Sequence, residues 1–207
     1  MEWYRRKSWT KKDEEEFFNH LNRARNYNRA QYLKVKAIEL IDTNDPKLLE
    51  IAKSLLFKML EEYPEEKNQI SSAFKALGDV YRNQNSIENA LKYYTKSLDF
   101  EEIYPNVRTE SYLEYSELII KTGKTDKYNF VKELILERFG TLIFPIEKYK
   151  TASILAIIYK KENDIESAMI YKNIAEENAK KENSGLTYHK YLGLVTKNEK
   201  WLDIFRN

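Results

Sequence analysis

The sequence predicts an all-α fold in which helical hairpins stack into a solenoid that takes up the whole chain. Apolar residues recur at intervals of three and four along most of the 207 residues, which is the spacing of one helix face. Small residues stand where paired helices would cross, as Gly78 and Ala90 do in the segment 71–104. Five glycines and four prolines are too few for an all-β fold of many turns. These observations indicate a single domain over residues 1–207.

Residues 1–28 are expected to form an N-terminal cap. Trp3 and Trp9 lie in a basic and aromatic lead-in, which either covers the open end of the solenoid or forms a contact patch; we favour the cover. Thr10 then precedes a helix, with Asp13 as its capping partner. Three arginines follow around a predicted turn, Arg23, Arg25 and Arg29. We expect them to pair with local carboxylates rather than to bind an acidic partner or phosphate.

The hairpins are predicted to span residues 29–183, and the first of them is degenerate. It consists of a helix over 29–42 and a second helix that begins at Pro46, because proline suits a first helical turn. Pro64 ends this second helix. The turn between the two helices is longer than the standard repeat turn by about three residues, which makes this hairpin degenerate.

The segment 71–104 gives the clearest hairpin. One face of its first helix carries three large side chains, Phe74, Leu77 and Tyr81. Gly78 lies beside them, and a glycine inside a helix costs about 1 kcal/mol relative to alanine. We therefore expect a neighbouring helix to approach where no Cβ fits. The second helix has its own inner line, Ala90, Tyr94 and Ser97. Ser86 is expected to be its N-cap, with Asn89 three residues on.

Two further hairpins follow. A helix over 108–122 ends at Gly123 and is followed by a helix over about 125–138. Residues 139–145 are expected to form a buried connection, with a short strand over 142–144 as the alternative, although no partner strand is in sight. The last hairpin repeats the crossing pattern with Ala152, Leu155, Ala156, Tyr159, Ala168 and Ala175. The sequence Lys-Lys-Glu-Asn, at 160–163 and again at 180–183, is predicted to place lysines in a last helical turn and an asparagine after it.

Residues 184–207 are expected to form a C-terminal cap. Residues 184–196 lose the helical period, but their side chains are too apolar for a free tail, and we expect these to lie on the last hairpin: Tyr188, Tyr191, Leu192, Leu194 and Val195. A short closing helix is predicted to seal the end with Trp201, Leu202 and Phe205.

Composition excludes several classes of function. Lys plus Arg number 35 and Asp plus Glu number 33, and the net charge of +2 argues against a dedicated nucleic-acid binder. The chain has no cysteine, so we expect neither disulfides nor a thiolate metal site. No apolar run approaches the roughly 18 residues that a membrane span needs. The first residues are too polar for a signal peptide, so the cytoplasm is the expected location.

The sequence offers no catalytic constellation. The two histidines are the obvious candidates for acid–base chemistry, but His20 has only Glu16 one turn before it, and two ligands do not make a metal site. We expect His189 to be a packed, hydrogen-bonded histidine. Nucleophile-elbow, Walker and Rossmann motifs are absent. The sequence therefore predicts no enzyme, no catalytic residue, no cofactor and no metal ligand.

The inner residues of the central hairpin resemble the tetratricopeptide repeat (TPR), whose period is about 34 residues: Phe74, Leu77, Gly78, Tyr81, Ala90, Tyr94 and Ser97. Pro105 comes a few residues later than the usual terminal proline of that family. The resemblance implies a concave face, lined by the first helix of each hairpin, that binds a peptide or protein. Carried onto this chain, it gives Gln31, Lys34, Ile38, Lys75, Asp79, Arg82, Asn83, Glu110, Leu113, Glu117, Lys121, Lys150, Ser153, Ile157 and Lys160. The alternative is that these residues are simply solvated helix faces.

Four stretches make the whole chain similar to small stand-alone bacterial TPR proteins: Trp3–Trp9, 23–33, 104–115 and 184–189. Some helical-repeat proteins of this size act as immunity proteins that bind a bacterial toxin, and this fold-level analogy gives the sharpest functional expectation. A peptide-sensing regulator and a general scaffold or adaptor are the alternatives. Nucleic-acid binding through the basic residues at 5–7, 11–12 and 23–29 is a further, less favoured one.

Overall fold

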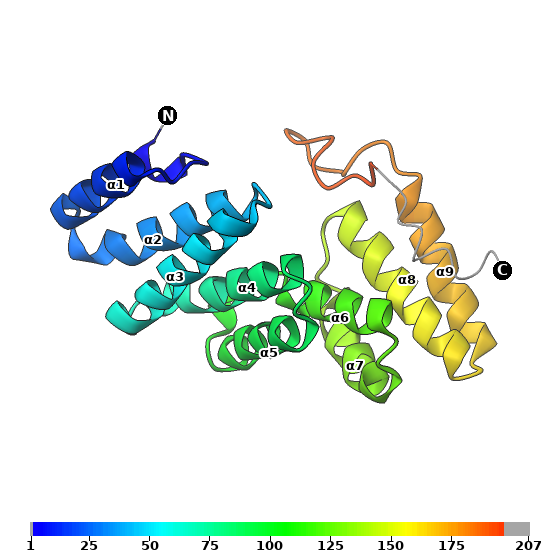
Figure 1. The fold of residues 1–207 in the computed structure, drawn as a ribbon. Coiled ribbons are helices and arrows are strands. Elements are labelled where there is room, and N and C mark those ends of the chain that lie inside the picture. Colours follow the sequence, from blue (N-terminus) through cyan, green and yellow to red (C-terminus); the bar gives the residue numbers. More distant parts are fainter. Residues whose placement is uncertain (1, 197–207) are drawn as a thin grey trace. The chain divides into compact units, whose positions relative to one another are not determined.

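The computed structural model describes residues 2–196, and every regular element in that range is a helix (Figure 1). The all-α prediction is therefore confirmed for these residues. The chain divides into two compact units, Met1–Ser111 and Tyr112–Asn207. The single domain over 1–207 stays a prediction. The closing helix expected around Trp201 lies outside the described residues.

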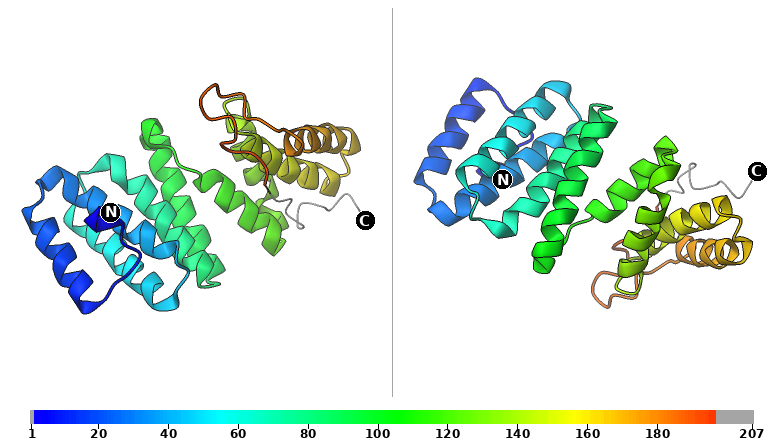
Figure 2. Two further views of the ribbon diagram at one scale, coloured as in Figure 1. Left: turned by 90° about the horizontal axis from the view of Figure 1, so that it is seen from above. Right: turned by 90° about the horizontal axis from the view of Figure 1, so that it is seen from below.

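The first unit is a layer of helices that follow one another in space as in sequence (Figures 1 and 2). Helix α2 packs on α3, α4 packs on α5, and both α2 and α3 contact α4, so the two hairpins stack side by side. Its elements are η1 (Trp3–Arg5), α1 (Lys11–Arg23), α2 (Asn26–Ile41), α3 (Pro46–Glu62), α4 (Lys67–Asn83), α5 (Ile87–Ile103) and η2 (Pro105–Val107).

The second unit begins at Tyr112, the second residue of α6. Tyr115 of α6 meets Phe130 of α7 edge to face, with ring centroids 5.6 Å apart, and α7 contacts α8. Helices α8 and α9 form a closely packed hairpin (Figure 1). The elements are α6 (Ser111–Thr122), η3 (Thr125–Lys127), α7 (Tyr128–Phe139), α8 (Pro145–Lys161) and α9 (Ile165–Ala179). Pairs α2/α3, α4/α5, α6/α7 and α8/α9 correspond to the predicted hairpins.

The turns inside these hairpins share one backbone feature, a residue with a positive φ angle. Each contains a residue in the left-handed region, where asparagine and glycine are tolerated best: Asn44, Asn85, Gly123 and Asn163. In the last three, the next residue donates its N–H back to a helix carbonyl: Ser86 to Tyr81, Lys124 to Ile119 and Asp164 to Tyr159. The prediction that Gly123 ends its helix is confirmed. The first turn lacks this hydrogen bond, as its degenerate sequence suggests.

Gly78 lies where the sequence predicted a close helix crossing. A Cβ atom at Gly78 would lie 2.3 Å from Cε1 of Tyr94, which is far inside van der Waals contact. The expectation of a close approach is confirmed, but the space is taken by the Tyr94 ring rather than by the backbone of α5. Ala90 is fully buried in the same hairpin.

The N-terminal lead-in packs on α1 and α2. Trp3 stacks on His20 of α1 at 5.1 Å and meets Tyr32 of α2 edge to face at 5.0 Å. Trp3 and Trp9 both pack against the buried core of the first unit, while their cover of a solenoid end stays a prediction. Thr10 and Asp13 form the predicted capping box at the start of α1.

Several local predictions were wrong. Helix α2 begins at Asn26 rather than at 29, because only Ala24 and Arg25 separate it from α1. Arg25 donates to the Tyr27 hydroxyl, and Arg29 donates to the carbonyl oxygens of Asn22 and Ala24. Among the described residues, neither arginine has the expected carboxylate partner.

Other corrections concern caps and connections. Ser86 precedes α5 but makes no side-chain cap, because its Oγ accepts from the Asn89 side chain instead. The connection expected to be buried leaves Ile143 60% exposed. Asn163 does follow the lysines that end α8, whereas α9 already ends at Ala179, before its own copy of the sequence. Tyr188, Tyr191 and Leu192 are exposed, although they were expected to lie on the last hairpin.

Candidate functional site

The residues predicted for the concave face fall into both units. In the first unit, Gln31 and Lys34 lie on α2, four others lie on α4, and Glu110 is exposed between η2 and α6. The residues on α4 are Lys75, Asp79, Arg82 and Asn83. Since α2 packs on α4, both helices belong to one stacked pair of hairpins. We name the side chains of Gln31, Lys34, Lys75, Asp79, Arg82 and Asn83 the α2/α4 surface.

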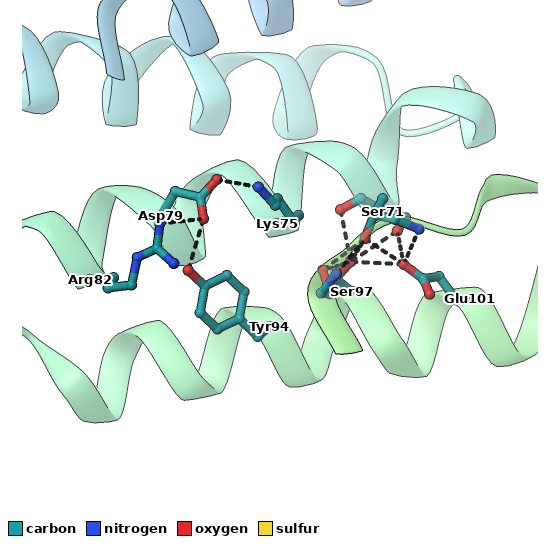
Figure 3. A network of polar contacts seen from close by, with 9 residues as sticks. Ser71, Lys75, Asp79, Arg82, Tyr94, Ser97 and Glu101 are labelled. Carbon is teal, nitrogen blue, oxygen red and sulfur yellow. Dashed lines mark hydrogen bonds and ion pairs between the residues drawn. The ribbon is translucent and has the colours of Figure 1, made fainter. Parts of the chain in front are cut away.

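Asp79 holds the α4 part of this surface together (Figure 3). The Tyr94 hydroxyl donates to its Oδ1 at 2.8 Å, and Lys75 Nζ donates to its Oδ2 at 2.9 Å. Arg82 Nη2 lies 3.7 Å from Oδ1. The carboxylate is mostly buried, with 14% of its side chain exposed, while the Arg82 side chain is 37% exposed. Asp79 thus orients both cations at the edge of the hairpin.

Lys34 is a half-buried cation on the neighbouring helix. It forms no hydrogen bond or ion pair with any of residues 2–196. Burial lowers the pKa of its ammonium group, because a charge loses hydration there without gaining a partner. Lys36, two residues on, differs from it. Its Nζ donates to the carbonyl oxygens of Arg6 and Ser8, so its charge is used within the fold.

A second polar network in the same hairpin was missed by sequence reasoning (Figure 3). Glu101 is buried, and its Oε1 accepts from Ser71 Oγ at 2.9 Å and from the backbone N–H and hydroxyl of Thr109 at 2.9 and 2.7 Å. Ser97 and Ser111 extend this network through hydroxyl contacts. The network fastens the segment after α5 to α4. Its hydroxyls and carboxylate point at one another, so we assign it a structural role.

The second unit has its own buried carboxylate among the predicted residues. Lys150 Nζ lies 2.6 Å from one oxygen of Glu117, and Lys121 Nζ lies 3.0 Å from the other. Glu117 is buried, whereas 40% of the Lys121 side chain is exposed. Lys160 is half-buried on α8. The remaining predicted residues are at most 7% exposed and offer little surface to a partner: Leu113, Ser153 and Ile157.

A repeated aromatic stack was also missed. Tyr81 stacks on Tyr93 with ring centroids 5.2 Å apart, and Lys53 of the preceding hairpin lies over Tyr81. In the second unit the same arrangement recurs, in which Tyr159 stacks on Tyr171 at 5.5 Å and Lys132 lies over Tyr159. Equal tyrosine spacing in the two hairpins was the sequence signal. Lysines at such positions link successive hairpins by cation–π contact.

The N-terminal basic residues are neutralised within the chain. Arg5 Nη1 lies 3.0 Å from Glu39, Arg6 is paired with Glu16, and Lys7 lies 3.1 Å from Asp42. An open groove of about 410 Å³, to which none of these three basic residues contributes, has two carboxylates and one lysine among its lining residues: Trp9, Glu14, Phe18, Glu50, Ile51, Ser54, Leu55 and Lys58. The predicted alternative of an aromatic and basic contact patch gains no support from this groove.

Residues 2–196 contain no group of three His, Cys, Asp or Glu side chains that could hold a metal ion. His20 is stacked on Trp3, and His189 is exposed rather than packed as expected. No helix in this range is long and apolar enough to cross a membrane. Comparisons with protein-family models, curated proteins and solved structures gave no match. We therefore base the function on the chain's own geometry.

Proposed function

We propose that this chain is a TPR-type, non-enzymatic protein-binding protein whose α2/α4 surface receives an acidic segment of a partner. Lys34 carries the proposal. A half-buried ammonium without an internal partner costs stability, because its desolvation is not offset. Groups held at such a cost cluster at functional sites, where a ligand supplies the missing interaction. A partner carboxylate beside Lys34 would do so.

The α4 side of the surface supports the same partner chemistry. Asp79 fixes Lys75 and Arg82, so little side-chain entropy remains to be lost when they bind. The Tyr94 hydroxyl orients the carboxylate from the other helix of the hairpin. The surface combines the two cations that Asp79 orients, a third on α2 that has no partner among residues 2–196, and the polar ends of Gln31 and Asn83. It therefore mixes charged with neutral polar groups. Such a surface fits a protein segment better than a nucleic-acid backbone.

Site-specific photo-crosslinking in the source organism tests the proposal. A photoreactive amino acid is placed at Asn83, which is exposed on α4, or at Lys92, which is exposed on α5. We expect a protein adduct from position 83 that disappears when Lys34→Glu is added, and no such adduct from position 92. Equal adducts from both positions, or an adduct that Lys34→Glu leaves unchanged, would contradict this assignment.

An immunity protein is the sharpest form of the proposal, and the resemblance in the sequence supports it. In that form the acidic partner is a bacterial toxin, and the α2/α4 surface neutralises it by binding. Cells that produce the chain should survive exposure to the toxin. Cells that produce the Lys34→Glu, Lys75→Glu variant should not, whereas Lys92→Glu should protect as well as the unchanged chain. If the unchanged chain and both variants protected equally, the α2/α4 surface would not be the surface that confers immunity.

A further inference from the structure

The segment after α9 is a compact loop with an internal hydrogen-bond network. Ser184 ties its two ends together, because its N–H donates to the Lys190 carbonyl at 2.7 Å and its hydroxyl donates to the His189 carbonyl at 2.8 Å. Inside the loop, Leu186 N–H donates to Ser184 Oγ, and His189 N–H donates to the Leu186 carbonyl. We name residues 184–192 the tyrosine loop.

The C-terminal end of the tyrosine loop is anchored to the start of α8. The carbonyl oxygen of Gly193 accepts from Ile146 N–H at 2.8 Å. Gly193 has a φ of +69°, and a Cβ atom there would lie 2.5 Å from Cδ1 of Phe144. Any other residue would therefore have a strained backbone conformation, and its Cβ would clash with the Phe144 ring. Glycine at this position lets the loop sit directly against Phe144.

This anchored loop turns its large side chains outward. Tyr188 is 92% exposed, Tyr191 is 80% exposed and Leu192 is 53% exposed. None of the three side chains makes a hydrogen bond or ring contact with residues 2–196. A grouped set of exposed aromatic and aliphatic side chains on an ordered backbone is typical of a contact surface, and tyrosine is enriched among residues that dominate binding energy.

Lysines flank these side chains in the sequence. Lys180 and Lys181 precede the loop and Lys190 lies within it, whereas Glu182 is the only acidic residue from 180 to 196. Lys190 is exposed and pairs with no described carboxylate. Lys181 is 3.9 Å from Glu177 on the last turn of α9. The loop thus combines exposed apolar side chains with one exposed lysine, Lys190, that has no described carboxylate partner. This combination is complementary to an acidic segment that carries an apolar residue.

We propose that the tyrosine loop is a second protein-contact surface, on which Tyr188 and Tyr191 anchor an acidic peptide segment and Lys190 pairs with one of its carboxylates. This surface belongs to the second unit and uses none of the residues of the α2/α4 surface. Binding at the tyrosine loop therefore does not depend on whether the α2/α4 surface binds a partner.

A displayed library of random peptides, selected on the full chain, tests the proposal. We expect selected peptides to share acidic residues next to an aromatic or aliphatic one. The Tyr188→Ser, Tyr191→Ser variant should weaken their binding about tenfold or more, since truncated anchors dominate such interfaces. Lys190→Glu should weaken it as well, and added salt should act in the same direction. Thermal unfolding should be unchanged in both variants, because the replaced side chains are exposed.

Control variants separate this proposal from the proposed function. Peptides whose binding is lost in Lys34→Glu, Lys75→Glu but kept in the tyrosine variant would support the α2/α4 surface and overturn the tyrosine loop. The reverse pattern would support the loop alone. Selection of no acidic peptide would overturn the loop proposal.

The same variants also test two other possible occupants of the tyrosine loop, a membrane surface and a second copy of the chain. Binding to phosphatidylglycerol vesicles, lost in the tyrosine variant, would make the loop a membrane contact and overturn the proposal. Self-association in sedimentation velocity that the tyrosine variant abolishes would instead identify a second copy of the chain as its occupant, and would overturn it equally.

Discussion

The hydroxyl of Tyr94 donates a 2.8 Å hydrogen bond to Asp79, and the ring that carries this hydroxyl occupies the space where Gly78 has no Cβ. Packing and the α2/α4 surface are therefore coupled at one point. Glycine lets the ring cross between α4 and α5, and the ring then places a donor beside the carboxylate that holds Lys75 and Arg82. A substitution at Gly78 should therefore move the Tyr94 ring and disturb the position of Asp79 on the α2/α4 surface.

Gly78→Ala should destabilise the chain despite the better helix propensity of alanine. The new Cβ would lie 2.3 Å from the Tyr94 ring, and overpacking of this kind costs about 1–3 kcal/mol. Removing a helical glycine gains only about 1 kcal/mol, so the cost equals or exceeds the gain. Urea unfolding should show a net loss of up to about 2 kcal/mol. Gly140→Ala is the control, because no atom lies within 4 Å of a Cβ there. A Gly78→Ala protein as stable as the unchanged chain would show that the ring moves aside freely.

Tyr94→Phe keeps the ring and removes the hydrogen bond to Asp79. The expected loss is about 1 kcal/mol in the free energy of unfolding, the usual net value of one hydrogen bond, with somewhat more because the acceptor is charged. Binding of the partner should also weaken, since Asp79 no longer holds a fixed position. A double-mutant cycle with Asp79→Asn measures the coupling. Additive effects in that cycle would mean that the hydroxyl and the carboxylate do not interact in solution.

The sequence was sufficient to predict the constraint at Gly78, because an internal helical glycine is costly and needs a reason. It also placed Asp79, Lys75 and Arg82 on one helix face, since the helical period alone determines that. It could not show that the Tyr94 hydroxyl reaches Asp79. That contact depends on the distance and angle between two packed helices, and the spacing of residues along one helix contains neither.

Two lysines on α2 show the same limit of prediction from helical spacing. Lys36 is satisfied by the carbonyl of Arg6, 30 residues earlier, and Lys34 has no described partner. Helical spacing treats them alike, because the difference comes from where the N-terminal segment lies. The exposed Tyr188 is the opposite case. Its apolar ring predicted burial, but the hydrogen bonds of Ser184 close the loop in a way that turns the ring outward.

Glu117→Gln should destabilise the second unit. The substitution removes the negative charge between Lys121 and Lys150 while keeping the size of the side chain. Removing one partner of a buried ion pair is costly, but both lysines retain some exposure, so we expect about 1–3 kcal/mol. Chemical unfolding followed by circular dichroism gives the value. Glu133→Gln, at an exposed position of α7, should change stability by less than about 0.5 kcal/mol. Equal effects of the two substitutions would indicate that the Glu117 pairs contribute nothing.

Lys34→Met should stabilise the fold at neutral pH and weaken partner binding at the same time. Methionine fills the same half-buried space without a charge, so about 0.5–1 kcal/mol of desolvation cost is expected to be recovered. Because burial lowers the pKa of Lys34 in the folded state, the unfolded chain binds more protons between that lowered pKa and the ordinary lysine pKa of about 10.4. The stability of the unchanged chain should therefore gain a rising contribution from Lys34 across that window, and the advantage of Lys34→Met should shrink there.

Urea unfolding of both proteins at a series of pH values isolates this difference, since every other titrating group is common to them. Lys92→Met, at an exposed position of α5, should show neither the gain at neutral pH nor its loss at high pH. If Lys34→Met proved less stable than the unchanged chain at pH 7, the ammonium would have to be satisfied within the folded chain. The partner carboxylate that we propose for Lys34 would then be unnecessary, and the α2/α4 surface would lose the observation on which its binding role depends.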